Sequence, residues 1–582
     1  MKTNIVLKPI SFTIASAIFL LGCIATDDKS ASSGVEPTHV ASAPRNPSPN
    51  VIEEKKQDRH NQTPHTHKTA RFKSEAITQS LSMHHSLEKS RINHKNMMKP
   101  RHALPATEPL NRENYHHFDG NPVNRVSEKP ISTFSIDVDT GAYANMRRFL
   151  NRGSLPRKDA VRVEEFINYF SYDYPQPEGK HPFSMTTEIS PTPWNNETLL
   201  LHIGVQGKDI DKLNLPPSNL VFLIDVSGSM QSTNKLELLK TSLKLLSKQL
   251  RPQDTVSIVV YAGASGVVLP PTTGDQTARI QQALDKLTAG GSTNGAAGIQ
   301  LAYQMAEQGF VENGINRVIL ATDGDFNIGT THFEALIDLI EQKRKSGVSI
   351  STLGFGMGNY NDRLMEQIAD AGNGNYAYID TLNEAQKVLV DELSSTLNTI
   401  AKDVKIQIEF NPSQVAEYRL VGYENRLLKR EDFNNDKIDA GDIGAGHSVT
   451  ALYEVSLFGS KGNLNVPLRY DVKDRLAKSI KNNELAFLRL RYKQPNGDKS
   501  SLIEQPINRQ QLKNELAKTS DRFRFSASVA AFGQQLRGAN YLQNYSYTDI
   551  LALARHSRGQ DPFGYRGEFV KLVNLAKSLD SK

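Results

Sequence analysis

The chain has 582 residues, enough for three or four domains of roughly 100–200 residues each. Hydrophobic residues make up 38% and charged residues 23%, which is typical of soluble globular protein. Residues 24–112 carry 14 basic and 9 acidic residues, whereas residues 113–582 carry 53 basic and 54 acidic ones. This balance argues against a strongly basic face on the folded part, and therefore against a nucleic-acid partner.

The N-terminus has the pattern of a secretory signal. Two lysines precede the apolar stretch Pro9–Gly22, which is too short for a comfortable membrane span. The letters LLGC, ending at Cys23, resemble the lipobox of bacterial lipoproteins, and Cys23 is the only cysteine. The resemblance implies a signal peptide over residues 1–22 and a lipidated Cys23. Because Ile24 rather than Asp follows, it implies the outer membrane of the bacterial cell envelope, facing the periplasm. The alternative is an ordinary signal peptide that contains a cysteine.

Residues 23–112 have the composition of a lipid-anchored, disordered tether. They contain few aromatic residues and many Ser, Pro, Lys, Asn and His, so they bury too little apolar surface to offset the entropy of ordering. Eight of the 15 histidines lie here: His39, His60, His65, His67, His84, His85, His94 and His102. We favour a solvated linker over a transition-metal site, because no fold fixes the geometry of these side chains.

A globular composition begins at Glu113, and residues 113–218 are predicted to form an α+β region. Apolar spacing predicts strands and helices as follows: strands at Ser132–Val138, Phe183–Ile189 and Leu199–Gly207, and helices at Ala142–Leu150 and Val161–Phe170.

The segment SIDVDT, Ser135–Thr140, raises a phosphatase interpretation. Asp-x-Asp-x-Thr after an apolar strand is the nucleophile signature of haloacid-dehalogenase phosphatases, but here the Thr directly follows the second Asp. Residues 141–218 also lack the strand–helix alternation that would carry the Lys and acidic pair of that chemistry. We expect Asp137 and Asp139 to cap the next helix or to pack structurally. A phosphatase-like hydrolase stays a distant alternative.

Walker, G-x-S-x-G and H-E-x-x-H motifs are absent, so we expect no enzyme.

Strands and helices alternate through residues 219–402, which are predicted to form one α/β domain with a doubly wound, mainly parallel sheet. Continuously apolar runs such as VFLI and RVILAT suit strands that are buried on both faces. The glycine-rich Gly354–Gly358 lacks the Rossmann spacing and is expected to form a turn. The predicted strands are Asn219–Asp225, Thr255–Tyr261, Gly266–Leu269, Arg317–Thr322, Val348–Phe355 and Tyr376–Ile379, and the predicted helices are Lys235–Leu250, Gln276–Leu287, Ala296–Glu307, Phe333–Lys345, Asp362–Ala371 and Leu382–Ile400.

Residues 403–582 are predicted to form a C-terminal domain that is first β-rich and then helical. The short strands read as a small sandwich, and the residues from Arg522 to Leu579 as mostly helix. The predicted strands are Val404–Phe410, Glu417–Tyr423, His447–Leu457 and Ala486–Tyr492.

Oxygen-bearing side chains gather where parallel strands of residues 219–402 are expected to end. Asp225 ends the first strand, with Ser227 and Ser229 just beyond it, Thr293 lies in the loop GGSTNG, and Asp323 follows another strand. Ligands of open α/β sheets collect at this edge. Two carboxylates and three hydroxyls, without Cys or His, favour Mg²⁺, Mn²⁺ or Ca²⁺ over zinc. The alternative is that the serines cap the next helix and Asp323 closes a turn.

The order Asp-x-Ser-x-Ser at Asp225–Ser229, then Thr293, then Asp323, resembles the metal-ion-dependent adhesion site of von Willebrand factor type A (VWA) domains. The resemblance implies that the serines coordinate a divalent cation, most simply Mg²⁺, and that a carboxylate from a protein partner completes its coordination. The segments STFSIDVDTGAYANMRRFL, EFNPSQVAEYRLVGYENR and RFRFSASVAAFGQQLRG resemble the flanking regions of a family of bacterial VWA lipoproteins.

Together these features predict a membrane-anchored, metal-dependent binding protein of the adhesion type, which captures an acidic side chain of a protein partner. The alternative is a scaffold of a cell-envelope complex in which the metal is largely structural.

Overall fold

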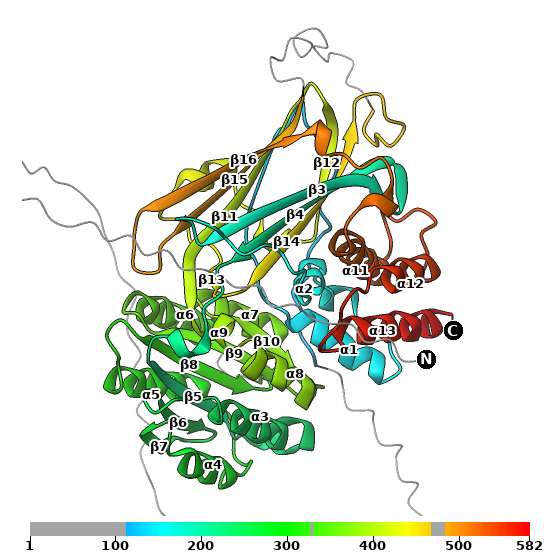
Figure 1. Cartoon of the computed structure of the whole chain (residues 1–582). Helices are drawn as coiled ribbons and strands as arrows, with labels where there is room; N and C mark the ends of the chain where they lie inside the picture. The colour runs from blue at the N-terminus through cyan, green and yellow to red at the C-terminus, as the bar shows by residue number, and fades with distance from the viewer. Residues whose placement is uncertain (1–111, 326–329, 467–482, 582) are drawn as a thin grey trace, which may run out of the picture. The chain divides into compact units, whose positions relative to one another are not determined.

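A computed structural model describes residues 112–325, 330–466 and 483–581 (Figure 1). The predicted signal peptide, Cys23 and the His-rich segment lie outside the described residues.

Six strands form the sheet that carries the candidate metal site. Their order is β10-β9-β8-β5-β6-β7, and every neighbouring pair is parallel except β6 with β7. The chain runs from β5 to β6 on one side and returns later as β8 on the other, so the carboxyl end of β5 is a topological switch point. The strands are β5 (Ser218–Asp225), β6 (Thr255–Tyr261), β7 (Ser265–Thr273), β8 (Ile315–Thr322), β9 (Ser349–Phe355) and β10 (Tyr376–Ile379).

Helices cover both faces of this sheet, which confirms the predicted doubly wound α/β fold (Figure 1). Leu220 and Phe222 of β5 pack in one layer, and Val221 and Leu223 pack in the other, because successive strand residues face opposite sides. The first layer contains α3 (Leu238–Ser247), α4 (Thr277–Asp285), α8 (Leu382–Gln386) and α9 (Leu393–Leu397), and the second contains α5 (Gly295–Gln308), α6 (Thr330–Lys345) and α7 (Asp362–Ala371).

Two predicted helices of this domain differ from the structure. A π-helical turn at Thr233–Glu237 precedes α3, so Lys235 lies in that turn. The single helix predicted over Leu382–Ile400 is wrong, because it divides into α8, a π-helical turn and α9 and ends at Leu397. The chain is already extended from Thr399, where pairing with another strand outweighs the helical pattern of the sequence.

Two antiparallel sheets form the predicted sandwich, with an apolar core between them. The first sheet has the order β1 (Asn124–Arg125), β12 (Val415–Val421), β14 (Ser448–Leu457), β4 (Asn195–Gly207) and β3 (Phe183–Thr192). The second has the order β13 (Ile443–Gly444), β11 (Thr399–Phe410), β15 (Glu484–Lys493) and β16 (Ser500–Asn508), and β2 (Ile131–Ser135) also pairs with β11.

The sandwich corrects the expectation of two separate flanking domains. β4 pairs with β14 and β2 pairs with β11, so residues before and after the α/β domain complete the same sheets. Neither segment could satisfy the edges of its strands alone, which is why they fold together. The α/β domain is therefore an insertion into one flanking region.

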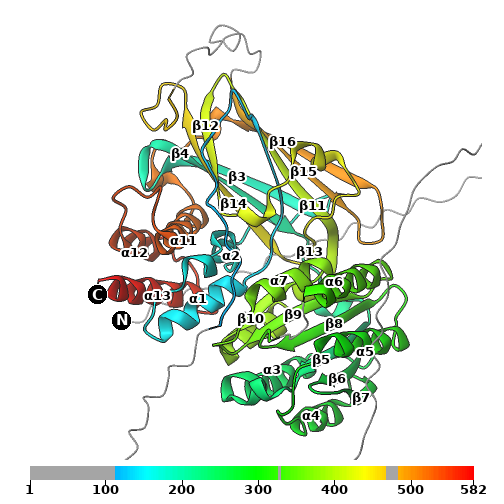
Figure 2. The ribbon, with the colours of Figure 1, turned by 180° about the vertical axis from the view of Figure 1, so that it is seen from behind.

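Helices from before and after the α/β domain form a second core of the flanking region, seen from behind in Figure 2. Phe170, just after α2, packs edge to face on Phe525 and Phe569 of the C-terminal helices. The helices are α1 (Gly141–Asn151), α2 (Val163–Asn168), α11 (Asp521–Arg537), α12 (Tyr547–His556) and α13 (Tyr565–Asp580).

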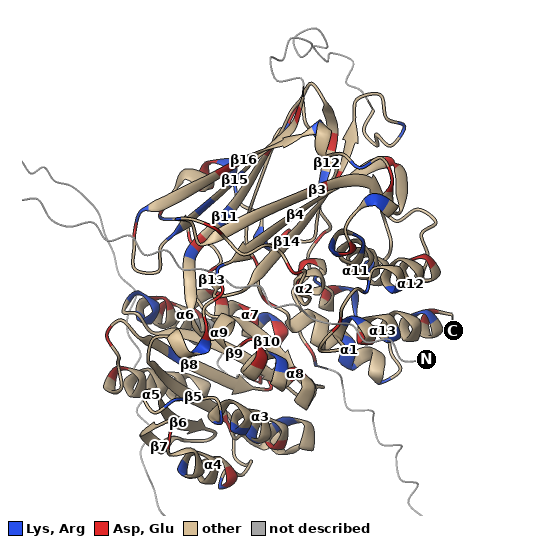
Figure 3. Ribbon diagram, in the orientation of Figure 1, with Lys and Arg blue, Asp and Glu red and all other residues tan. Residues whose placement is uncertain are grey.

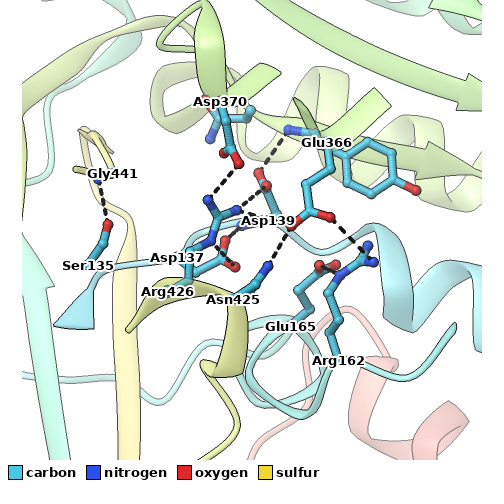
Figure 4. A network of polar contacts seen from close by, with 12 residues as sticks. Ser135, Asp137, Asp139, Arg162, Glu165, Glu366, Asp370, Asn425, Arg426 and Gly441 are labelled. Carbon is cyan, nitrogen blue, oxygen red and sulfur yellow. Dashed lines mark hydrogen bonds and ion pairs between the residues drawn. The ribbon is translucent and has the colours of Figure 1, made fainter. Parts of the chain in front are cut away.

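A buried ion-pair network joins the flanking region to α7 of the α/β domain (Figure 4). Arg426 contacts Asp137 at 3.0 Å and Asp370 of α7 at 2.7 Å. Arg162 contacts Asp362, the first residue of α7, at 2.6 Å. Removing one partner of such a buried pair leaves an uncompensated charge, so the network holds α7 firmly against the flanking region.

Asp137 and Asp139 pack structurally in this network, as expected, but neither of them caps α1. Asp139 accepts a hydrogen bond from the Tyr376 backbone N–H at 2.8 Å and contacts Arg426 at 3.4 Å. The first turn of α1 is instead satisfied by Glu165, which accepts from the Ala142 N–H at 2.7 Å.

Glu164, beside this network, predicts a pH dependence of stability. Burial, followed by the nearby Glu424 and Asp137 carboxylates, raises the pKa of Glu164 from 4.5 to about 8. A carboxyl with a raised pKa in the folded state favours folding below pH 4.5, and that contribution is lost as the pH rises through about 8. The unfolding free energy of wild type should therefore fall between pH 5 and pH 9. In Glu164→Gln this fall should be smaller by on the order of 3 kcal/mol.

Urea denaturation at both pH values measures this difference. The exposed Glu312→Gln is the control and should keep the wild-type pH dependence. Equal pH dependence in wild type and Glu164→Gln would contradict the assignment.

Candidate metal site

Asp225 ends β5 at the switch point of the sheet, with no exposed surface. Its Oδ1 accepts a hydrogen bond from the Ser227 N–H at 2.8 Å. Its Oδ2 accepts from the Thr322 hydroxyl at 2.7 Å and from the Tyr261 hydroxyl at 3.3 Å. Burial raises the pKa of Asp225 above its ordinary value, although the hydrogen bonds from Ser227 and Thr322 oppose this. A buried carboxylate of this kind is stabilised by a nearby cation.

The two serine hydroxyls lie side by side, with their Oγ atoms 3.0 Å apart. Neighbouring ligands on an octahedral Mg²⁺, each about 2.1 Å from the ion, are also about 3.0 Å apart. Ser227 stands at the start of a short 3-10 turn, yet its side chain makes no capping hydrogen bond. The helix-capping alternative for this serine is therefore wrong, and the spacing suits two ligands of one ion.

Thr293 comes to the site through its loop. The Gly228 N–H donates to the Gly291 carbonyl at 3.0 Å, and the Gly290 N–H donates to the Val226 carbonyl at 2.8 Å. These bonds hold the loop against the residues that follow β5. Among the described residues the Thr293 hydroxyl has no hydrogen-bond partner, so its oxygen is free to bind a cation.

Asp323 is buried at the end of β8, where its Oδ2 accepts hydrogen bonds from two side chains that the sequence did not point to. The Lys235 ammonium donates at 2.8 Å and the Asn359 amide at 3.1 Å. Lys235 also donates to Asn359 Oδ1 at 2.8 Å, which closes a triangle of contacts. Asp323 Oδ1 accepts from the Asp325 N–H at 3.1 Å, so Asp323 does close a turn, as the alternative expected.

The glycine-rich segment Gly354–Gly358 was the one feature of the sequence that bears on Lys235, because one of its glycines packs against the lysine side chain. Gly356 and Gly358 have φ of +78° and +86°, which confirms the predicted turn. A Cβ at Gly356 would lie 2.3 Å from Lys235 Cε, so this glycine leaves room for the lysine stem. The helical pattern around Lys235 gave no reason to turn its side chain toward the site.

The donor set fits a hard divalent cation. In the described ranges no group of three or more His, Cys, Asp or Glu could hold a metal. The buried carboxylates of this site are Asp225 and Asp323, and the exposed Asp325 accepts from the Asn359 amide at 3.4 Å. Asp225, Ser227 and Ser229 would hold the ion, Thr293 stands in the loop that is bonded to the residues after β5, and Lys235 orients Asp323. With so few protein ligands, water and an incoming oxygen must complete the octahedron. Such an ion supplies a localised positive charge that attracts a carboxylate.

Comparison with known proteins shows the family of this chain. The model described as "von Willebrand factor type A domain" matches residues 220–325, the one described as "von Willebrand factor" matches residues 109–202, and "Uncharacterized protein YfbK, C-terminal" matches residues 395–579. The chain is 51% identical to YfbK of Escherichia coli (strain K12) over 472 residues, which covers 80% of this chain and 81% of YfbK. The chain belongs to the YfbK family. The predicted membership of a bacterial VWA family is thereby confirmed.

Other relatives are less than 30% identical to this YfbK-family chain. Protein sll0103 of Synechocystis sp. is 29% identical over 185 residues, covering 32% of this chain and 43% of sll0103. Human inter-alpha-trypsin inhibitor heavy chain H3 is 24% identical over 264 residues, covering 42% and 29%. A solved von Willebrand factor type A structure from Catenulispora acidiphila aligns with a TM-score of 0.39 at 15% identity, covering 69% of this chain and 91% of that one.

Two further observations bear on partners of this YfbK-family chain. Figure 3 shows Lys and Arg interspersed with Asp and Glu along the described elements, in line with the balanced charge of residues 113–582. Within the described ranges, no helix combines the length and apolar character needed to cross a membrane. VWA domains commonly mediate protein–protein interactions and usually bind a divalent cation, so a protein partner suits the family.

Proposed function

We propose that this protein is a membrane-anchored binding protein that captures an acidic side chain of a protein partner through a divalent cation, most simply Mg²⁺. The observation that carries the proposal is the joint placement of Asp225, Ser227 and Ser229 at the switch point of the sheet, with the two hydroxyls 3.0 Å apart. Hard oxygen donors at this spacing suit Mg²⁺ better than a softer metal.

The charges around the site favour an anionic ligand. Asp225 and Asp323 contribute two carboxylates, and the Lys235 ammonium contacts Asp323 at 2.8 Å. A divalent cation together with Lys235 exceeds these two buried carboxylates by one positive charge, and the third carboxylate nearby, Asp325, is exposed to solvent. A carboxylate from the partner would neutralise this excess in a partly desolvated place, where charge pairing is strong.

We propose binding rather than catalysis as the role of this protein. The Asp-x-Asp pair that suggested a phosphatase is buried, and Arg426 pairs with Asp137 at 3.0 Å and with Asp139 at 3.4 Å. A carboxylate nucleophile needs an open path to its substrate, which these contacts oppose. Phosphatase activity that disappeared in Asp137→Asn would revive the hydrolase alternative.

Affinity capture of envelope proteins tests the proposed role. The full-length protein is used as bait in Mg²⁺ and in EDTA, with Asp225→Asn as a second bait. We expect a partner that is retained only by the wild type in Mg²⁺ and that excess acetate displaces. A partner held equally well in EDTA and by Asp225→Asn would favour the scaffold with a largely structural metal.

The anchor is proposed from the LLGC sequence at Cys23. Cys23→Ser removes the thiol that would carry the acyl chains, and each buried CH₂ of such chains contributes about 0.8 kcal/mol to membrane binding. We expect the variant to move from the outer-membrane fraction to the soluble fraction on cell fractionation. The control Ala25→Ser, two residues further along the chain, should stay in the membrane. Equal membrane retention of Cys23→Ser and wild type would rule out lipidation.

A further inference from the structure

A short N-terminal strap, residues 112–115, runs along the loop that follows β9. The Arg112 N–H donates to the Gly358 carbonyl at 2.7 Å, and the Asn114 N–H donates to the Tyr360 carbonyl at 2.9 Å. Between them, Glu113 Oε1 accepts from the Gly358 N–H at 2.8 Å. Three successive strap residues therefore bind one loop. The pairing resembles two short parallel strands, and Asn114 forms an isolated parallel β-bridge with Asn361.

Glu113 is held firmly from the flanking side. Its two carboxylate oxygens accept from Arg148 at 2.7 and 2.9 Å, and its side chain is 2% exposed. A bidentate pair with a buried arginine of α1 fixes the carboxylate in one orientation. The Gly358 amide is consequently bound to a rigid acceptor.

The same loop supplies the metal site. Asn359, next to Gly358, donates to Asp323 at 3.1 Å and accepts from Lys235 at 2.8 Å. One residue thus separates the strap contact from a direct contact with a residue of the metal site.

The far end of the loop is also fixed. Asn361 caps α7 by accepting from the Leu364 N–H at 3.4 Å, and Arg162 binds Asp362 at 2.6 Å. The Tyr378 hydroxyl binds the Gly356 carbonyl at the start of the loop and the ion pairs on α7 hold its end, while the strap binds Gly358, the residue next to Asn359.

We propose that the strap is a positioning element of the metal site: Glu113, through the Gly358 amide, places Asn359 against Asp323 and so sets the affinity for the cation. This inference rests on the proposed cation binding.

Mn²⁺ titration of the full-length protein, followed by electron paramagnetic resonance, tests the inference. Asn359→Ala removes a side chain next to a metal-site residue, a change that typically weakens metal binding about 10–100-fold. Glu113→Ala removes the hydrogen bond to the loop together with the ion pair to Arg148, and should weaken binding about three- to tenfold. Glu113→Gln keeps an oxygen for the Gly358 N–H and should lie closer to wild type. Hydrogen exchange of residues 356–361 in EDTA should quicken in Glu113→Ala.

The double variant Glu113→Ala with Asn359→Ala decides how the strap acts. If Glu113 acts through Asn359, the double variant should bind Mn²⁺ as weakly as Asn359→Ala alone. Glu424→Ala is the matched control, because it removes a 2.7 Å ion pair with Arg537 in the flanking region without touching the loop. It should leave the Mn²⁺ affinity within about twofold.

Three results would overturn the inference. One is a Glu113→Ala affinity within twofold of wild type, and another is a double variant in which the two losses multiply. The third is Mn²⁺ binding that is equally weak in wild type and Asp225→Ala, which removes the metal site itself and the proposed function with it. The first two outcomes leave the proposed function intact.

Discussion

Replacing Asp225 by Asn is expected to abolish the stabilisation that Mg²⁺ gives the folded protein. The carboxylate is fully buried, and it would be the one charged ligand in direct contact with the ion. Wild type in Mg²⁺ at 100 times the dissociation constant should gain about 2.7 kcal/mol over wild type in EDTA, and the variant almost nothing. Thermal unfolding in Mg²⁺ and in EDTA measures both gains.

The metal-free protein should tolerate this change. Burial raises the pKa of Asp225, which means that its negative charge is unfavourable when no cation is present. An uncharged amide of the same shape removes that charge. The amide oxygen can still accept from the Ser227 N–H. In EDTA, Asp225→Asn should therefore be as stable as wild type.

Asp254→Asn is the matched control for this prediction. Asp254 is also a buried carboxylate, but it accepts from the Ser218 N–H at 2.9 Å at the opposite, amino end of β5. Its replacement should lower stability equally in Mg²⁺ and in EDTA. Undiminished Mg²⁺ stabilisation of Asp225→Asn would contradict the assignment of Asp225 as a ligand.

Lys235→Met should have the largest effect on the stability of the cation-free protein. The lysine side chain is 6% exposed and Asp323 is 0% exposed, so the change leaves a buried carboxylate without its cation. Breaking a buried pair in this way costs about 3–5 kcal/mol of unfolding free energy. Methionine is chosen because its unbranched chain can follow the same path over Gly356.

Mg²⁺ should restore part of the stability that Lys235→Met loses. A divalent ion at Asp225 and the serines brings positive charge close to Asp323, so it should stabilise the variant by about 1–2 kcal/mol more than wild type. Urea denaturation with and without Mg²⁺ measures this difference.

A second buried lysine provides the control for this prediction. Lys387 is 2% exposed and contacts Glu392 at 2.6 Å, and neither residue belongs to the metal site. Lys387→Met should lose stability to the same extent in Mg²⁺ and in EDTA. If Lys235→Met also lost the same stability in Mg²⁺ and in EDTA, the cation would not lie close enough to Asp323 to replace the charge of Lys235.

The α/β domain could be predicted because its signals are local. Continuously apolar strands and amphipathic helices alternate, and strands such as Thr255–Tyr261 and Tyr376–Ile379 begin and end at the predicted residues. The ligand order at Asp225–Ser229 is likewise a local pattern. Asp225, the two serines and Asp323 were visible in the sequence because they stand at the ends of predicted strands, whereas Thr293 was found through its glycine-rich loop before a helix.

The flanking region could not be predicted in the same way because its pairings are distant in sequence. The register between β4 and β14 joins residues about 250 positions apart, as in His202 with Leu452. The sequence of either strand alone does not identify the strand with which it pairs. The support of Asp323 by Lys235 and Asn359 is similar, since it depends on where a π-helical turn and a glycine-rich loop meet.

Anomalous diffraction from crystals grown with Mn²⁺ tests the central claim most directly. The account predicts a single strong peak bound by Asp225, Ser227 and Ser229, about 2.1–2.2 Å from their oxygen atoms, with Asp323 still held by Lys235. The peak should vanish in Asp225→Asn. No peak at these residues in saturating Mn²⁺, or an equal peak in the variant, would contradict the claim that they form a cation site.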